Sequence, residues 1–167
     1  MFGKCIALLS LLLATSSSLV SAADVHPRGV SAAVIVNAKP NTIYAAIRGL
    51  RDEPDSDVKE LSKDVSHSVL EEKFCGLPII GQAVCVYEEK YQPSSRIDYH
   101  MLRSDKFKAF EGAWVLTPVS GHSTRVELRH YVDTGLRFPF ARQLTDAQTT
   151  KDIKERLQEV KAKSECQ

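Results

Sequence analysis

The sequence predicts an α+β domain in which an antiparallel sheet packs against one long C-terminal helix. Three observations support this class: runs of period two between residues 65 and 132, short polar turns between those runs, and a final segment, Phe140 to Lys163, that contains no Pro or Gly. Consecutive period-two strands joined by short turns form a meander with one buried face. A helix of about 24 residues is ~36 Å long, which is enough to cross a whole sheet.

The first 23 residues have the pattern of a cleaved secretory signal. A short basic start precedes the apolar run of residues 5–14, and residues 20–23, Val-Ser-Ala-Ala, are small enough for signal peptidase. The apolar run is too short for a bilayer-spanning helix. We therefore expect residues 1–23 to be removed and residues 24–167 to form one secreted or periplasmic domain.

The first half of the expected domain has three parts. Residues 30–36 are rich in Ala, Val and Ile, which predicts a strand. Residues 41–50 carry apolar side chains at helical spacing, and Pro40 is suited to the first position of a helix. Residues 51–64 are charged and lack a core face, which predicts a solvated loop with at most a weak helical turn.

Five strands are expected to follow, over residues 65–74, 83–91, 96–103, 107–117 and 124–132. Residues 92–95 and 118–121 contain Pro, Ser and Gly and are predicted to be turns. The C-terminal helix then presents an apolar stripe, interrupted at Thr150 and Lys151 and made of Phe140, Leu144, Ala147, Ile153, Leu157 and Val160.

The composition and the absence of certain motifs argue against several classes of function. The formal net charge is +1 and no basic stripe is present, which argues against nucleic acid as a partner. The chain has neither a phosphate-binding glycine loop nor a Gly-x-Ser-x-Gly nucleophile turn. Its five His residues lack paired short spacing with one another or with Cys, so neither a metal site nor a cofactor is expected.

Two cysteines bracket a predicted hairpin loop. In an exported protein, Cys75 and Cys85 are candidates for a local disulfide worth ~3 kcal/mol, and two buried thiols are the alternative. The role of Cys166, next to the C-terminus, is left open by the sequence.

Three local features resemble the START-like, or SRPBCC, helix-grip superfamily. They are residues 36–44, where a strand runs into a helix, residues 110–118 followed by 124–128, and the terminal helix after Phe138-Pro139. The resemblance covers the whole mature chain. It implies a sheet of about seven strands curved around the C-terminal helix, with a cavity between them. Six strands are evident, so the seventh is expected from a split segment or from residues 78–91.

The superfamily includes lipid-transfer domains, coenzyme Q-binding proteins and aromatic polyketide cyclases, and the resemblance implies an apolar ligand in the cavity. The predicted ligand-binding residues are inward-facing positions of the sheet and helix: Tyr99, Met101, Phe110, Trp114, Leu116, Val126, Leu128, His130, Leu144 and Ala147. His130 and Tyr99 are the polar groups expected to point inward, and the only candidates for an acid and base.

The leading hypothesis is a non-catalytic carrier of a hydrophobic small molecule or lipid. The alternatives are a cyclase- or dehydratase-type enzyme that uses His130 and Tyr99, and an interaction module without a cavity. The apolar residues 77–80 are expected at a rim, where transient contact with a membrane surface is possible. The identity of the ligand and the oligomeric state do not follow from the sequence.

Overall fold

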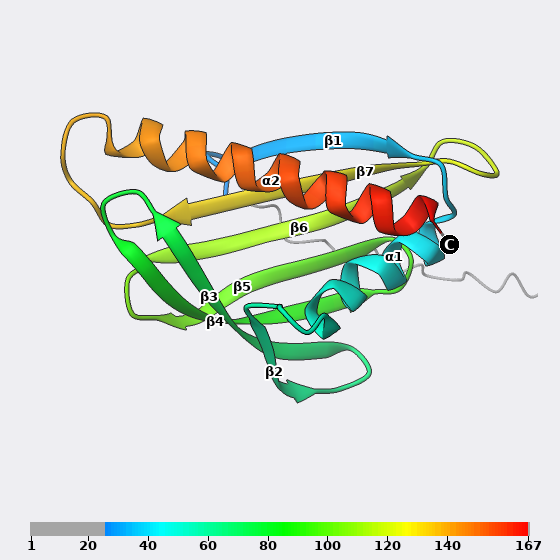
Figure 1. Ribbon diagram of the computed structural model, residues 1–167, viewed down its shortest axis with the longest axis horizontal. Helices are drawn as coiled ribbons and strands as arrows, with labels where there is room; N and C mark the ends of the chain where they lie inside the picture. Colours follow the sequence, from blue (N-terminus) through cyan, green and yellow to red (C-terminus); the bar gives the residue numbers. More distant parts are fainter. Residues whose placement is uncertain (1–25, 167) are drawn as a thin grey trace, which may run out of the picture.

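A sheet of seven antiparallel strands is the framework of the computed structural model, which describes residues 26–166. The elements in chain order are β1 (Val30–Val36), α1 (Pro40–Gly49), the 3₁₀ turn η1 (Leu50–Asp52), β2 (Val58–Lys63), β3 (His67–Leu77), β4 (Gly81–Gln92), β5 (Arg96–Ser104), β6 (Ala109–Pro118), β7 (Thr124–Asp133) and α2 (Ala141–Glu165). The strand order is β1-β7-β6-β5-β4-β3-β2, so a six-strand meander is completed by β1 beside β7. Helix α2 lies across β1 and β7 (Figure 1).

The signal peptide predicted for residues 1–23 lies outside the described residues. Within residues 26–166, none of the helices combines the length and apolarity needed to cross a membrane.

Three irregular points interrupt the strand register, and the first, in the pairing of β2 with β3, lies between Glu60 and Ser62. The register of β3 with β4 shifts between Phe74 and Leu77, and that of β4 with β5 shifts between Val86 and Tyr87. An extra residue on one strand locally increases twist and bends the strand. The end of the β3–β4 hairpin turns towards the start of α2, where residues 77–80 and residues from 136 to 144 line a common small cavity (Figure 1).

Helix α2 packs through a narrow stripe. Its buried residues past the first turn are Thr149, Ile153, Leu157, Val160 and Ser164, at spacings of three and four. The two buried hydroxyls donate to carbonyl oxygens one turn earlier, Thr149 to Thr145 at 2.8 Å and Ser164 to Val160 at 2.7 Å. Polar residues therefore occupy the packed face without losing hydrogen bonds.

The predicted stripe is confirmed only for its C-terminal half. Phe140, Leu144 and Ala147 are exposed. Ala147 precedes the buried Thr149 by two residues, and at 3.6 residues per turn this separation places it on the opposite side of the helix. Leu144 lies at the edge of the covered side, where it lines a small cavity.

The prediction of a loop over residues 51–64 was wrong for Val58–Lys63, whereas the weak helical turn that it allowed is present as η1. Within residues 51–64, β2 pairs antiparallel with β3, and this edge strand is the seventh strand, which was expected from a split segment or from residues 78–91. An edge strand needs one hydrogen-bonded neighbour and commonly carries charged side chains. The charged residues of β2 therefore hid it from a search for alternating apolar positions.

The predicted Cys75–Cys85 disulfide is not formed, and both residues are free thiols. Cys85 pairs across the sheet with Glu72, three residues before Cys75, so the two cysteines are out of register. Cys85 is also fully buried while Cys75 is exposed. Bond formation needs Cα atoms within roughly 7 Å, which this arrangement does not favour. Burial raises the pKa of the Cys85 thiol to about 12.

Candidate functional site

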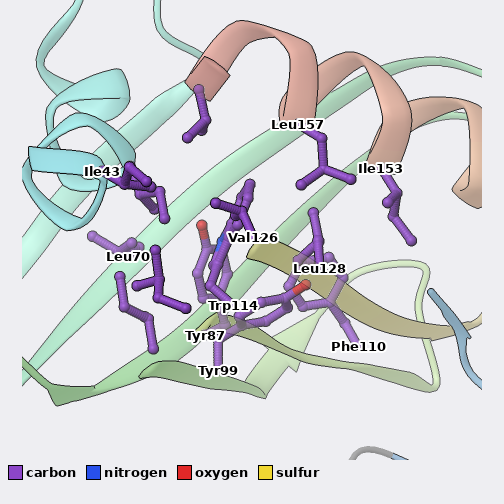
Figure 2. Close-up of a cluster of buried hydrophobic side chains, with 14 of the residues drawn as sticks. Ile43, Leu70, Tyr87, Tyr99, Phe110, Trp114, Val126, Leu128, Ile153 and Leu157 are labelled. Carbon is purple, nitrogen blue, oxygen red and sulfur yellow. The ribbon is translucent and has the colours of Figure 1, made fainter. Parts of the chain in front are cut away.

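A cavity of about 750 Å³ lies between the concave face of the sheet and α2. The volume is within the range of roughly 300–1,000 Å³ that is typical of small-molecule sites. Figure 2 shows Ile153 and Leu157 pointing from α2 towards side chains of the sheet. The apolar and aromatic residues that line the cavity are Ile47, Leu50, Val58, Leu70, Phe74, Leu77, Tyr87, Tyr99, Phe110, Trp114, Leu128 and Ile153.

Tyr99 and His130 meet across a glycine in the cavity wall. Tyr99 on β5 pairs with Gly112 on β6, and Gly112 pairs in turn with His130 on β7. The missing side chain at Gly112 lets the Tyr99 ring pass over β6, and the phenol oxygen lies 2.6 Å from Nδ1 of His130. The sequence-based expectation that both residues point inward is confirmed.

Both members of this pair are uncharged at neutral pH. Burial lowers the pKa of His130 from 6.5 to about 3, and the positive charge of Arg156 acts in the same direction. Burial also raises the pKa of Tyr99. A neutral imidazole has one N–H donor and one acceptor, so either the phenol donates to Nδ1 or Nδ1–H donates to the phenol oxygen. The pair thus offers hydrogen bonds to a bound molecule without adding charge.

We expect His130 to make folding stability depend on pH in acid. Its pKa is lower in the folded state, so the unfolded chain binds more protons between about pH 6.5 and about pH 3, and stability falls as the pH is lowered through this window. The slope for one proton is at most about 1.4 kcal/mol per pH unit. Urea denaturation across this range should show a shallower dependence for His130→Gln, with the same substitution at exposed His122 as the control. Parallel curves for wild type and His130→Gln would contradict this assignment.

A second polar group joins α2 to the sheet inside the cavity. The Arg156 guanidinium forms an ion pair with Glu72 on β3, and the Tyr87 hydroxyl donates to the other carboxylate oxygen at 3.0 Å. The Glu72 carboxylate raises the pKa of Arg156. Only 5% of the Glu72 side chain is exposed, whereas 43% of the Arg156 side chain is accessible and lines the cavity. The pair therefore places a neutralised guanidinium where a ligand can reach it.

A third polar cluster lies where α1 and η1 meet the sheet. Arg51 lies 3.1 Å from a carboxylate oxygen of Glu89 and 3.6 Å from one of Glu60. The Tyr91 hydroxyl donates to Glu89 at 2.9 Å, and the Arg48 guanidinium lies 4.4 Å from the centre of the Tyr91 ring. Burial raises the pKa of Glu89, and Arg51 opposes that shift. The cluster ties η1 to β4 and β2 beside the cavity.

An apolar rim, defined as residues 77–80 and Leu136, Phe138 and Leu144, lines a smaller cavity of about 50 Å³, and the exposed Phe140 lies next to it in the chain. Phe110 and His130 line both cavities, so the rim lies next to the larger one. Ile79 and Phe140 are 65% and 72% exposed and adopt positive φ angles of 72° and 67°. Such angles are strained for residues other than glycine. The expected apolar rim is present, and its contact with a membrane surface stays a prediction.

The structure brings five of the ten predicted ligand-binding residues to the large cavity: Tyr99, Phe110, Trp114, Leu128 and His130. Leu144 lines the small cavity at the rim. Leu116 and Val126 are buried, and Met101 packs at the edge of the core, none of them lining either cavity. Ala147 is exposed on α2 and lies away from both cavities, because its side of the helix faces outwards.

The charged residues of the cavity were not among the site residues predicted from the sequence. Glu72 occupies an inward position between Leu70 and Phe74, and Arg156 lies three residues after Ile153 and four before Val160 on the buried stripe of α2. A charged residue in the register of an apolar face was the available signal in both cases. Charges are seldom fully buried without a partner, so each one predicts a counter-charge or a cavity.

The concave sheet, the long helix across it and the cavity between them define the helix-grip class of proteins. No protein-family model matches the sequence, and no curated protein matches it either. Solved structures do resemble the fold. The Zhui aromatase/cyclase from Streptomyces sp. R1128 has a TM-score of 0.69 at 17% identity, over 82% of this chain and 93% of that one.

A protein of Thermus thermophilus gives a TM-score of 0.65 at 19% identity, over 81% of this chain and 96% of that one. A START superfamily protein from Mycobacterium smegmatis gives a TM-score of 0.55 at 19% identity, over 77% of this chain and 93% of that one. The chain therefore has the START-like, or SRPBCC, helix-grip fold, as the sequence resemblance predicted.

Proposed function

We propose that this protein binds, and carries, a hydrophobic small molecule or lipid in the cavity between α2 and the sheet. The observation that supports the proposal is the cavity of about 750 Å³, whose lining combines aromatic and aliphatic residues of the sheet and α2 with charged residues, of which Arg156 is paired with Glu72 and Arg51 with Glu89. Transfer of an apolar ligand from water to such a surface is favourable by roughly 25 cal/mol per Å² of apolar area buried. The Tyr99–His130 pair and Arg156 are placed to orient polar atoms of the ligand.

A cyclase- or dehydratase-type enzyme is the alternative with a specific observation behind it, since Tyr99 and His130 are in direct contact in the cavity. General acid–base catalysis is most effective when the pKa of the catalytic group lies near the working pH. The lowered pKa of His130, about 3, makes it a weak base at neutral pH, which favours binding over catalysis. The third hypothesis, a module with a filled core, is inconsistent with the size of the cavity.

A larger side chain inside the cavity should weaken binding without changing the fold. Ile153 lines the cavity from α2 and is 2% exposed, whereas Ala147 on the same helix is exposed and faces away. We expect Ile153→Trp to weaken binding of the uncharged dye N-phenyl-1-naphthylamine by about ten-fold or more, because a cost of about 1.4 kcal/mol is sufficient for that factor. Fluorescence titration measures the affinity.

Ala147→Trp is the matched control and should bind the dye as the wild type does. Circular dichroism checks that both variants keep the fold. Equal affinities for wild type and Ile153→Trp would place the dye outside the cavity, and absence of dye binding by the wild type would contradict the proposed function.

A further inference from the structure

We propose that the cavity selects its ligand by charge: it takes an uncharged or cationic hydrophobic molecule and disfavours organic anions such as carboxylates and sulfonates. The inference rests on the proposed function and specifies its ligand class. It follows from two observations within residues 26–166: the arginines that line the cavity are paired with carboxylates, and several acidic residues that line it have no ion pair.

The charged residues that line the cavity are mostly acidic. Eight are acidic, namely Glu53, Asp55, Asp57, Glu72, Glu89, Asp152, Glu155 and Glu159, and three are basic, namely Arg51, Lys73 and Arg156. Their formal sum is −5, although the whole chain carries +1. The lining is thus far more negative than the protein as a whole.

The two arginines of the cavity are already neutralised. Arg156 is paired with Glu72, and Arg51 lies between Glu89 and Glu60. An anionic ligand would have to compete with a carboxylate for either guanidinium. His130 supplies no positive charge, because its pKa is lowered to about 3. The third basic residue of the lining, Lys73, is exposed to solvent, on the opposite face of β3 from Glu72. An anion that leaves water for the interior of this cavity would therefore find no free counter-charge there to offset its desolvation.

Five acidic lining residues are exposed and define the mouth of the cavity: Glu53, Asp55, Asp57, Glu155 and Glu159. Glu53, Asp55 and Asp57 lie in the loop after η1, and Glu155 and Glu159 lie on α2. Glu53 pairs with Lys163 and Glu155 with Lys151. Among the described residues, no ion pair engages Asp55, Asp57 or Glu159. Charges of one sign around an opening in a low-dielectric wall concentrate their field there and repel ligands of the same sign.

A matched pair of dyes tests the inference. N-phenyl-1-naphthylamine is uncharged, and 8-anilinonaphthalene-1-sulfonate is the same skeleton with one sulfonate. At an ionic strength of about 0.01 M, where charges act over roughly 30 Å, we expect the sulfonate to bind about ten-fold more weakly or worse. At about 1 M, where the range falls to roughly 3 Å, the gap should narrow.

Variants that neutralise acidic residues test whether the mouth of the cavity causes the difference in affinity between the two dyes. The triple substitution Asp55→Asn, Asp57→Asn and Glu159→Gln should raise the affinity for the sulfonate several-fold and leave that for the uncharged dye unchanged.

The matched control removes three acids from the outer face of the sheet, with Glu71→Gln, Glu88→Gln and Glu111→Gln, and should leave both affinities unchanged. Comparable binding of the two dyes at low salt, or an equal gain in the control, would overturn the inference while leaving the proposed function intact. Binding of neither dye would overturn the proposed function itself.

Discussion

Replacing Glu72 by Gln should lower the free energy of unfolding by ~2–3 kcal/mol. The substitution leaves the Arg156 guanidinium inside the fold without its counter-charge, and breaking a buried ion pair at one partner costs about 3–5 kcal/mol. We use a smaller value because 43% of the Arg156 side chain is accessible and keeps part of its hydration in the cavity. Urea denaturation measures the change.

A double substitution separates the ion pair from local packing. Arg156→Met removes the charge that Glu72→Gln leaves unpaired, so the double variant should recover most of the loss, whereas independent effects would add. Glu71→Gln is the matched control, because Glu71 neighbours Glu72 on the other face of β3. Equal stabilities of Glu72→Gln and the wild type would contradict the role assigned to the pair.

Adding one methyl group at Gly112 should cost ~3 kcal/mol and disrupt the cavity wall. A Cβ at this position would lie 2.1 Å from the phenol oxygen of Tyr99 and 2.5 Å from the backbone oxygen of Arg129. Side chains cannot approach so closely, so in Gly112→Ala the Tyr99 ring must move and lose its hydrogen bond to His130. Overpacking of this kind typically costs about 1–3 kcal/mol, and here backbone also obstructs relief.

Thermal or urea denaturation of Gly112→Ala measures the cost, and dye titration reports whether the displaced ring enters the cavity. Gly121→Ala is the control, because a Cβ at this turn position meets no atom within 4 Å. Truncation of the ring in Gly112→Ala/Tyr99→Leu should recover part of the stability but not all of it, since the contact with the Arg129 carbonyl persists. A fully stable Gly112→Ala with unaltered binding would mean that the close approach of Tyr99 is dispensable.

The inward positions of Tyr99 and His130 could be predicted because alternation in a strand is local. In β5 and β7 the apolar residues mark the buried face, and a polar residue in the same register must face the same way. Gly112 carried a further signal, since a glycine inside a strand often marks a close approach of other atoms. Its partner, however, could be identified only when the register of β5, β6 and β7 was known.

The charged part of the cavity depends on pairing between distant segments. Glu72 and Arg156 are 84 residues apart. In the sequence, each one interrupts an apolar face without a visible reason, and only the folded structure shows that the two charges form a pair. The same holds for Arg51 and Glu89 and for the acidic mouth, which combines the loop after η1 with α2.

By itself, the sequence determined the fold class, most of the strands, both helices and the inward direction of the aromatic side chains, because these follow from periodicity between neighbours in the chain. The tertiary structure alone decided that residues 58–63 form the edge strand and that Cys75 and Cys85 are out of register. It also decided which side of α2 is covered at the start of the helix and how large the cavity between α2 and the sheet is. Those outcomes depend on register and on the rotation and docking of a helix, which are set by contacts between segments far apart in the sequence and leave no local pattern.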